Sequence, residues 1–290
     1  MDHYRIISDS TTDLAPEMVE EMDVTILPLQ FLIDEKSYYN YPDERDLSGK
    51  KFYELIRGGK SATTVQINVD TFLTCFEKYL KNGEDILYFA FSSGLSGTFN
   101  SANIAANELR EKYHDRKLIL IDSLAASMGE GLLLYYAASK KKAGASIDEV
   151  ASWLETNKNH LCHWFTVDDL FHLKRGGRVS SFAAVVGTAL GIKPVLHVDD
   201  EGHLIPVQKV RGRKQALANL VEHMEKTCTN PEEQTIFISH GDCEEDALYV
   251  ADLVRQKFKV RDIKVHMIGP VIGAHSGPGT VALFFLGTQK

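Results

Sequence analysis

Short apolar segments alternate with amphipathic segments through the first half of this chain, and this alternation constrains the fold more than any other feature. The amphipathic segments repeat apolar residues at helical spacing, and Asn82-Gly83 ends one of them. The apolar segments have the length and the Ile, Leu, Phe and Tyr content of strands. They are Tyr4–Ile7, Val24–Leu32, Ile86–Phe91 and Leu118–Ile121. Strands that alternate with helices predict a mainly parallel sheet covered on both faces.

The sequence pattern changes near residue 166, and helices and strands are predicted on both sides of this point. Ser146 and Glu149 form a capping box that predicts the start of a helix, and Asp199–Gly202 predicts a hairpin turn. Other predicted helices are 47–57, 128–142, 215–227 and 244–258, and other predicted strands are 194–198, 204–207, 235–239 and 263–268. We therefore predict an N-terminal α/β domain over residues 1–166 and a second α/β domain over residues 167–290.

Charge and cysteine content exclude several classes of function. The net charge of −8 disfavours nucleic-acid binding, because such a field repels phosphate backbones. The four cysteines form no Cys-x-x-Cys pair, so we expect neither a disulfide framework nor a metal site. Free thiols, the lack of a signal-peptide pattern and the lack of an apolar run of about 20 residues predict a cytoplasmic protein.

Four loops carry residues suited to ligand binding, because ligands of open α/β sheets lie beyond the carboxyl ends of strands. Ser92–Thr98 combines serines and glycines with a helix start, where free N–H groups favour an anion. It matches neither a nucleotide P-loop nor a Gly-x-Ser-x-Gly elbow. The other loops are Ser8–Leu14, Lys60–Gln66 and the glycine-rich Ile268–Gly279, which contains His275. Each of these loops also has a purely structural interpretation as a helix cap or a turn.

Basic residues gather in two places despite the acidic net charge. One group is Lys174, Arg175 and Arg178, and the other is Lys209, Arg211, Arg213 and Lys214. They are either solvated polar segments or a docking surface for an acidic protein partner.

Together these loops resemble the DegV family, which includes the fatty-acid-binding subunits of bacterial fatty acid kinases. The resemblance covers nearly the whole chain. It depends on the motifs Ser8–Leu14, Ser92–Thr98, Leu173–Ser180, Ile192–Pro194, Lys209–Gly212 and Ile268–His275.

The resemblance implies a two-domain DegV-like fold, with a Rossmann-like sheet in the N-terminal domain and a lipid tunnel between the domains. It implies that Thr64, Ser96 and His275 bind the carboxylate of one long-chain fatty acid, with Gly97 in the same loop. Thr63 and Ser93 stay open as alternatives. The family often has Thr-Ser-Gln-Pro where this chain has Thr64–Ile67, a departure in the hydroxyl loop that contains Thr64.

The implied function is that of a non-catalytic subunit without cofactor in bacterial phospholipid metabolism. It would present the fatty acid to a separate, dihydroxyacetone-kinase-like fatty acid kinase, and it would contact membranes transiently to exchange ligand. Arg211 matches a basic residue of the head-group region or of the kinase contact, and Lys174, Arg175 and Arg178 would dock the kinase.

Tail burial would have to supply most of the affinity. Each buried methylene contributes about 0.8 kcal/mol, or roughly 11 kcal/mol for a sixteen-carbon chain, against association costs on the order of 4 to 15 kcal/mol. Phe182–Leu190 and Val281–Leu286 could line the tunnel or be plain core. The competing hypotheses are a serine hydrolase that uses Ser96 or Ser93 with His275, and a lipid-responsive regulator.

Overall fold

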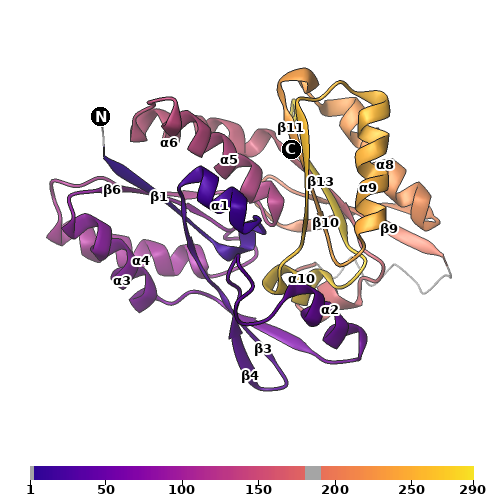
Figure 1. Cartoon of the computed structure of the whole chain (residues 1–290), viewed down its shortest axis with the longest axis horizontal. Helices are drawn as coiled ribbons and strands as arrows, with labels where there is room; N and C mark the ends of the chain where they lie inside the picture. Colours follow the sequence, from indigo (N-terminus) through magenta and orange to yellow (C-terminus); the bar gives the residue numbers. More distant parts are fainter. Residues whose placement is uncertain (1–2, 180–190) are drawn as a thin grey trace.

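The computed structural model describes residues 3–179 and 191–290, which form two large sheets, one small sheet and the helices that cover them (Figure 1). The first sheet contains β2 (Thr25–Leu27), β1 (Tyr4–Asp9), β6 (Asp85–Ala90) and β7 (Leu118–Asp122), in that order. The small sheet contains β4 (Lys36–Tyr39), β3 (Gln30–Ile33) and β5 (Ala62–Val65). The second sheet contains β10 (Leu204–Arg211), β9 (Ile192–Val198), β8 (Leu161–Thr166), β13 (Val281–Leu286), β11 (Thr235–His240) and β12 (Asp262–Met267).

Ten α-helices lie in the described ranges, and most were predicted. They are α1 (Pro16–Met22), α2 (Gly49–Arg57), α3 (Val69–Lys81), α4 (Thr98–Lys112), α5 (Met128–Lys142), α6 (Ile147–Asn157), α7 (Phe171–Arg175), α8 (Arg213–Thr227), α9 (Glu244–Lys257) and α10 (Pro270–Ser276). The predicted capping box at Ser146 and Glu149 is confirmed, and it begins α6.

The first sheet is parallel throughout, as predicted. Alternate residues of its strands face opposite sides: Ile6, Leu87 and Phe89 pack toward α5 and α6, whereas Ile7, Ile86 and Tyr88 pack toward α3 and α4. Both faces are therefore covered, and the strands read as nearly continuous apolar runs.

The single strand predicted over Val24–Leu32 is wrong. The chain leaves β2 at Leu27, passes Pro28, and starts β3 at Gln30 in the small sheet. Proline has no N–H group for a sheet ladder, so the apolar run is divided between two sheets.

The second sheet is mixed, with β11 and β12 parallel and the other neighbours antiparallel. Helices α8 and α9 pack on its outer face. The strand β8 lies in this sheet, although its residues fall within the predicted N-terminal domain, and the division at residue 166 stays a prediction.

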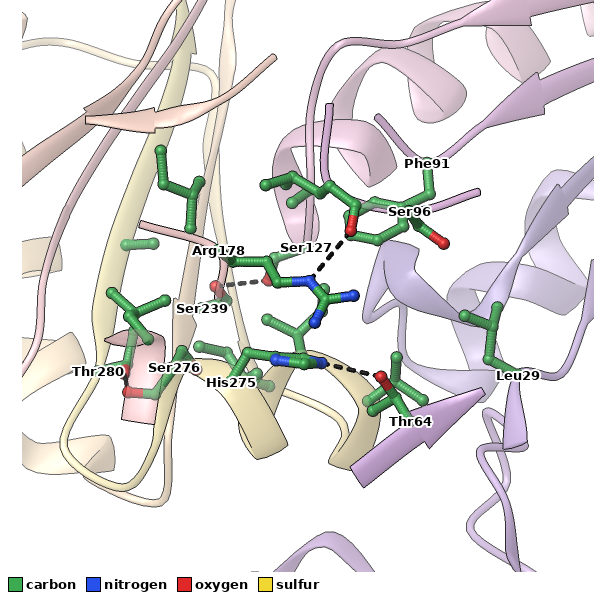
Figure 2. Close-up of a pocket in the computed structure, with 18 of the residues that line it drawn as sticks. Leu29, Thr64, Phe91, Ser96, Ser127, Arg178, Ser239, His275, Ser276 and Thr280 are labelled. Carbon is green, nitrogen blue, oxygen red and sulfur yellow. Dashed lines mark hydrogen bonds between the residues drawn. The ribbon is translucent and has the colours of Figure 1, made fainter. Parts of the chain in front are cut away.

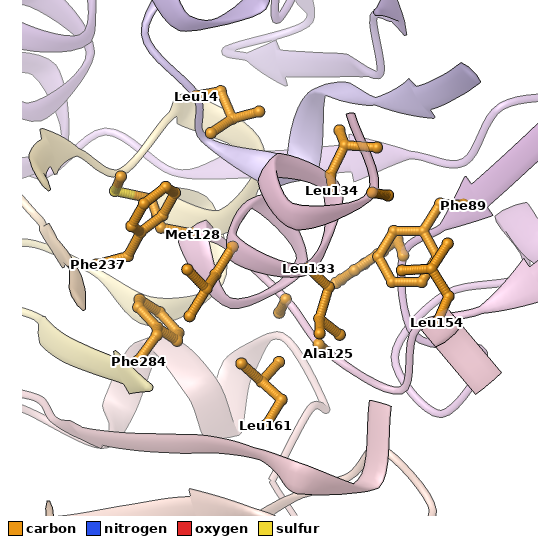
Figure 3. Close-up of a cluster of buried hydrophobic side chains, with 14 of the residues drawn as sticks. Leu14, Phe89, Ala125, Met128, Leu133, Leu134, Leu154, Leu161, Phe237 and Phe284 are labelled. Carbon is orange, nitrogen blue, oxygen red and sulfur yellow. The ribbon is translucent and has the colours of Figure 1, made fainter. Parts of the chain in front are cut away.

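Helix α5 lies between the two large sheets and joins their cores (Figure 3). Its residues Leu133 and Leu134 lie in the same cluster as Phe89 of the first sheet and Phe284 of the second sheet. Nine of its fifteen residues are buried, among them Glu130. A helix that is apolar on nearly all sides is a buried helix, and α5 fits that description.

Three segments that we expected to be irregular are regular. The hydroxyl loop near Thr64 contains the strand β5, and the polar stretch after Asp169 contains α7. The glycine-rich loop contains α10, which begins with Pro270 at its first turn and ends at Gly277, whose φ is 80°. The predicted tunnel segment Phe182–Leu190 lies outside the described residues.

No helix in residues 3–179 and 191–290 has the length and apolar character needed to cross a bilayer.

Candidate functional site

A cavity of about 350 Å³ lies between the two large sheets and under α10. This volume is within the range of small-molecule sites. Most of its wall is apolar and comes from both halves of the chain. The apolar lining is Leu29, Val65, Phe91, Leu95, Ala126, Phe165, Leu173, Leu204, Ile268, Val271, Ile272 and Ala282.

Thr64 and His275 meet at one end of this cavity, although 211 positions separate them in sequence (Figure 2). Thr64 lies in β5 and His275 in α10, and the distance between Thr64 Oγ1 and His275 Nε2 is 2.8 Å. The sequence predicted this pairing only through the family resemblance.

The imidazole of His275 is neutral at pH 7. Burial, with the nearby positive charges of Arg178 and Arg175, lowers the pKa of His275 to about 4. Its Nδ1 is buried and has no hydrogen-bond partner among the residues that the structure describes. This nitrogen lies so close to Gly176 that a Cβ added there would be 2.2 Å from it.

Ser96 and Gly97 line the cavity from the loop before α4. The hydroxyl of Ser96 lies 2.9 Å from Thr98 Oγ1 and accepts a hydrogen bond from the Thr98 N–H at 3.2 Å. The loop therefore presents a hydroxyl group and the N-terminal end of a fifteen-residue helix to the cavity, which is the arrangement that favours an anion.

Arg178 also lines the cavity, which the sequence did not predict, because we assigned it to a docking surface (Figure 2). Its Nε donates to the carbonyl of Leu95 at 3.2 Å, and its Nη1 donates to the carbonyl of Gly176. A guanidinium has five N–H donors, so these contacts leave capacity for an anion. Arg178 thus adds a positive charge to the end of the cavity that holds Thr64, Ser96 and His275.

The alternative hydroxyl residues Thr63 and Ser93 are both exposed and do not line the cavity. Thr63 pairs with Leu32 and Thr64 with Phe31, and successive side chains of a strand point to opposite faces. The Ser93 N–H donates to Asp122 at 3.1 Å, away from the cavity.

The remaining basic residues of the prediction lie outside the cavity. Lys174 and Arg175 are exposed on α7, and Arg211 is exposed at the end of β10. None of the three lines the cavity.

Further polar residues of the wall were not predicted. Ser127 donates to Asp13 at 2.6 Å and lies 2.9 Å from Ser239 Oγ, and both serines line the cavity (Figure 2). Asp13 also accepts from the Gly269 N–H at 2.9 Å, and burial raises its pKa to about 8. His163 and Ser276 line the cavity as well. Two sequence motifs pointed to part of this wall: Ser8–Leu14 contains Asp13, and Ile268–Gly279 contains Gly269 and Ser276.

The site combines an apolar cavity with a polar end that carries hydroxyls, an imidazole and a guanidinium. Such a site can hold an amphipathic anion. It lacks the geometry of a serine nucleophile, because His275 Nε2 is bonded to Thr64 and no group orients its Nδ1. No group of three or more His, Cys, Asp or Glu side chains that could hold a metal ion occurs in the described part of the chain.

Comparisons with known proteins agree on one family. The family model described as "Uncharacterised protein, DegV family" matches residues 3–288. A DegV domain-containing protein of Clostridium perfringens is 51% identical over 290 residues, which are 100% of this chain and 99% of the relative.

Solved structures of DegV proteins share the fold. A DegV lipid binding protein of Thermotoga maritima has a TM-score of 0.85 and 31% identity, covering 100% of both chains. DegV of Bacillus subtilis, described as a fatty acid binding protein, has a TM-score of 0.84 and 29% identity, covering 98% of this chain and 99% of that one. The chain therefore belongs to the DegV family.

Proposed function

We propose that this protein binds one long-chain fatty acid in the cavity and presents its carboxylate to a separate ATP-dependent kinase, which would form an acyl phosphate. The observation that carries the proposal is the convergence of Thr64, Ser96, His275 and Arg178 at one end of an apolar cavity. The proposal is consistent with the DegV structures described as lipid-binding or fatty-acid-binding.

The carboxylate would be bound by charge as well as by hydrogen bonds. A buried carboxylate needs donors, because an unpaired buried charge costs several kcal/mol. When His275 Nε2 donates to Thr64, the Thr64 hydroxyl can donate one hydrogen bond to the carboxylate, Ser96 can donate another, and Arg178 can pair with the negative charge. The positive field of Arg178 and Arg175, which lowers the pKa of His275, would favour the ionised acid.

The polar end of the cavity lies near the surface. Val65, Gln66 and Gly97 line it and are exposed, and Val65 is 40% exposed. A phosphoryl donor held by a second protein could approach the carboxylate there, whereas the apolar tail would stay in the interior.

Replacement of Thr64 tests the carboxylate site. Thr64→Val removes one hydroxyl while keeping the β-branched shape, so the Kd for palmitate should rise about tenfold, the effect of one lost hydrogen bond. Thr63→Val is the matched control, since it removes the neighbouring hydroxyl from the opposite face of β5. Isothermal titration of delipidated protein measures both variants, and equal affinities would contradict the assignment of Thr64.

A second pair of variants tests the Ser-Gly loop. Ser96→Ala should weaken palmitate binding, whereas Ser93→Ala should not, because Ser93 is exposed and does not line the cavity. Native mass spectrometry of the purified wild-type protein should detect one bound fatty acid per chain. Protein that carries no lipid and takes up none would refute the proposal.

The presentation step needs its own experiment. Arg175→Glu and Arg211→Glu reverse exposed charges outside the cavity, and they should lower acyl phosphate formation by an added dihydroxyacetone-kinase-like kinase without removing bound lipid. Arg255→Glu is a control, since Arg255 is exposed on α9. Unchanged turnover in the first two variants would count against docking at these residues.

The rival functions predict other results. A serine hydrolase would be labelled at Ser96 by a fluorophosphonate probe and would turn over esters, but the bond between Thr64 and His275 argues against that activity. A lipid-responsive regulator would bind the acid equally well but would support no acyl phosphate formation with any kinase.

A further inference from the structure

The wall of the cavity contains polar side chains besides those proposed to bind the carboxylate. They are His163 of β8, Ser239 of β11 and Ser127, which precedes α5. We call these three residues the inner polar patch. A plain alkyl tail has no group that could bond to it.

The sheet register locates the patch. Ala282 of β13 pairs with Phe165 on one side and Ser239 on the other, so these three residues form one row across the second sheet. Phe284 pairs with His163 and Phe237 in the next row on the same face. Two residues of a strand span about 7 Å, so His163 lies one row further than Ser239 from Thr280 and the α10 end of the cavity.

His163 is the member of the patch whose hydrogen bonding is incomplete. Its side chain is 4% exposed, and its Nδ1 is buried without a hydrogen-bond partner among residues 3–179 and 191–290. Its ring packs 4.5 Å from the ring of Phe284 and 5.6 Å from that of Phe165. Burial lowers its pKa well below the usual value, so the ring is neutral. A buried polar atom without a partner destabilises a protein and calls for an explanation.

The two serines differ from His163 because they are bonded to each other, and Ser127 also donates to Asp13. A serine hydroxyl has one proton and two lone pairs, so each can accept a further bond. The patch therefore offers the spare acceptor capacity of two serines and the ring of His163, whose unpaired Nδ1 is buried and would face the cavity only after the ring rotates.

We propose that the inner polar patch is a second recognition site for the ligand, and that the preferred ligands are long-chain acids with a hydroxyl or oxo group on the distal part of the chain. This inference depends on the proposed fatty-acid binding and specifies the class of acid. Once the ring of His163 has rotated, a hydroxyl group on the ligand chain can donate to the neutral imidazole or accept from it. The same hydroxyl group could instead donate to one of the serines.

Competition between substituted and plain acids tests the inference on the wild-type protein. Delipidated protein would be titrated with stearic acid and with stearic acids that carry one hydroxyl at successive positions from mid-chain to the end. We expect one position to bind about tenfold more tightly than stearic acid, the factor of one hydrogen bond. Equal or weaker binding at every position would overturn the inference and leave the proposed function intact, whereas no binding of any acid would overturn both.

Substitution of His163 identifies the residue responsible. His163→Phe keeps a ring of similar shape, so it should abolish the preference for the hydroxylated acid while stearic acid binds as tightly as before. His197→Phe is the matched control, because His197 also has a buried Nδ1 without a partner but stacks on Trp164 and does not line the cavity. A preference that survives in a folded His163→Phe protein would overturn the role of His163. If that variant does not fold, His163→Gln and the wild-type series decide the question.

Discussion

At the scale of single residues, the hydroxyl group of Thr11 has one proton but contacts two carboxyl groups. Thr11 Oγ1 lies 2.6 Å from Asp9 Oδ1 and 2.8 Å from Glu130 Oε2. Ser8 Oγ likewise lies 2.6 Å from the carbonyl of Phe89 and 2.9 Å from Glu130 Oε1. Two hydroxyl protons cannot serve four contacts between oxygen atoms, so the carboxyl groups must hold at least one proton. Burial, which raises the pKa of both Asp9 and Glu130, gives the same result.

Glu130→Gln tests this protonation. A glutamine can donate one hydrogen bond and accept another, as a protonated glutamate does. A carboxyl whose pKa is raised on folding stabilises the protein below its unfolded pKa and loses that effect as the pH rises. The stability of Glu130→Gln relative to wild type should therefore increase between pH 5 and pH 8. Urea denaturation at both pH values measures the difference, and Glu108→Gln, at an exposed position on α4, should show none.

His275 has the opposite dependence on pH. Its folded pKa of about 4 lies below the usual 6.5, so the unfolded chain binds a proton more readily, and the stability should fall as the pH drops from about 6.5 to 4. The contribution is at most about 3 kcal/mol, from about 1.4 kcal/mol per pKa unit. His275→Gln should be less sensitive in this window, as measured by urea denaturation. An unchanged pH profile would mean that folding does not lower the pKa of His275.

The residues of the site could be predicted only in part from the sequence. Thr64, Ser96 and His275 were selected by resemblance, and strand alternation, which requires the structure, separates Thr64 from Thr63. The place of Arg178 in the cavity wall was not predicted, because a charge near Lys174 and Arg175 looks solvated in a sequence. Its contact with Leu95, 83 positions away, exists only in the folded chain.

At the scale of elements, the end of α7 packs against α10. Gly176 caps α7 with a φ of −72°, a conformation open to any residue, so only space requires glycine there. A Cβ at this position would meet His275 Nδ1 at 2.2 Å. The missing side chain at Gly176 leaves the space that the imidazole occupies while it bonds to Thr64.

Gly176→Ala should therefore displace His275 with little loss of stability, because a flexible side chain can move. We expect palmitate binding to weaken about tenfold, the effect of one lost hydrogen bond, with a nearly unchanged unfolding midpoint. Gly58→Ala is a close match, since Gly58 caps α2 with the same φ of −72° and does not line the cavity. Comparable affinities for the two variants would argue against this contact.

Helices and long strands were easier to predict than the elements of the site. α5 and α6 follow from apolar spacing and a capping box, which are local features. β5 has four residues, and its strand character comes from pairing with β3. Of the seven residues of α10, Gly273, Ala274 and Ser276 are small and Pro270 has a restricted backbone. The sequence of α10 therefore resembles that of a loop.

At the scale of the whole molecule, the proposed ligand would join the two halves of the chain. Thr64 and Ser96 come from the part that contains the first sheet, and Arg178 and His275 come from the part that contains the second. A ligand present at 100 times its Kd stabilises the native state by about 2.7 kcal/mol.

Delipidation should thus lower the thermal midpoint, and added palmitate should restore it. For a protein of this size the shift is roughly 4 °C, as differential scanning fluorimetry would measure. Thr64→Val should show a smaller shift at the same palmitate concentration. A thermal midpoint that does not change when palmitate is added would contradict binding to the folded state.

The position of α5 has a consequence for how the molecule unfolds. Its apolar residues are shared by two cores, so neither sheet can keep its own packing after the other has come apart. Cooperative units follow shared contacts rather than boundaries drawn on a sequence. Loss of structure should accordingly be a single all-or-none event, and a fragment that ends near residue 166 would leave one flank of this helix bare to water and would aggregate.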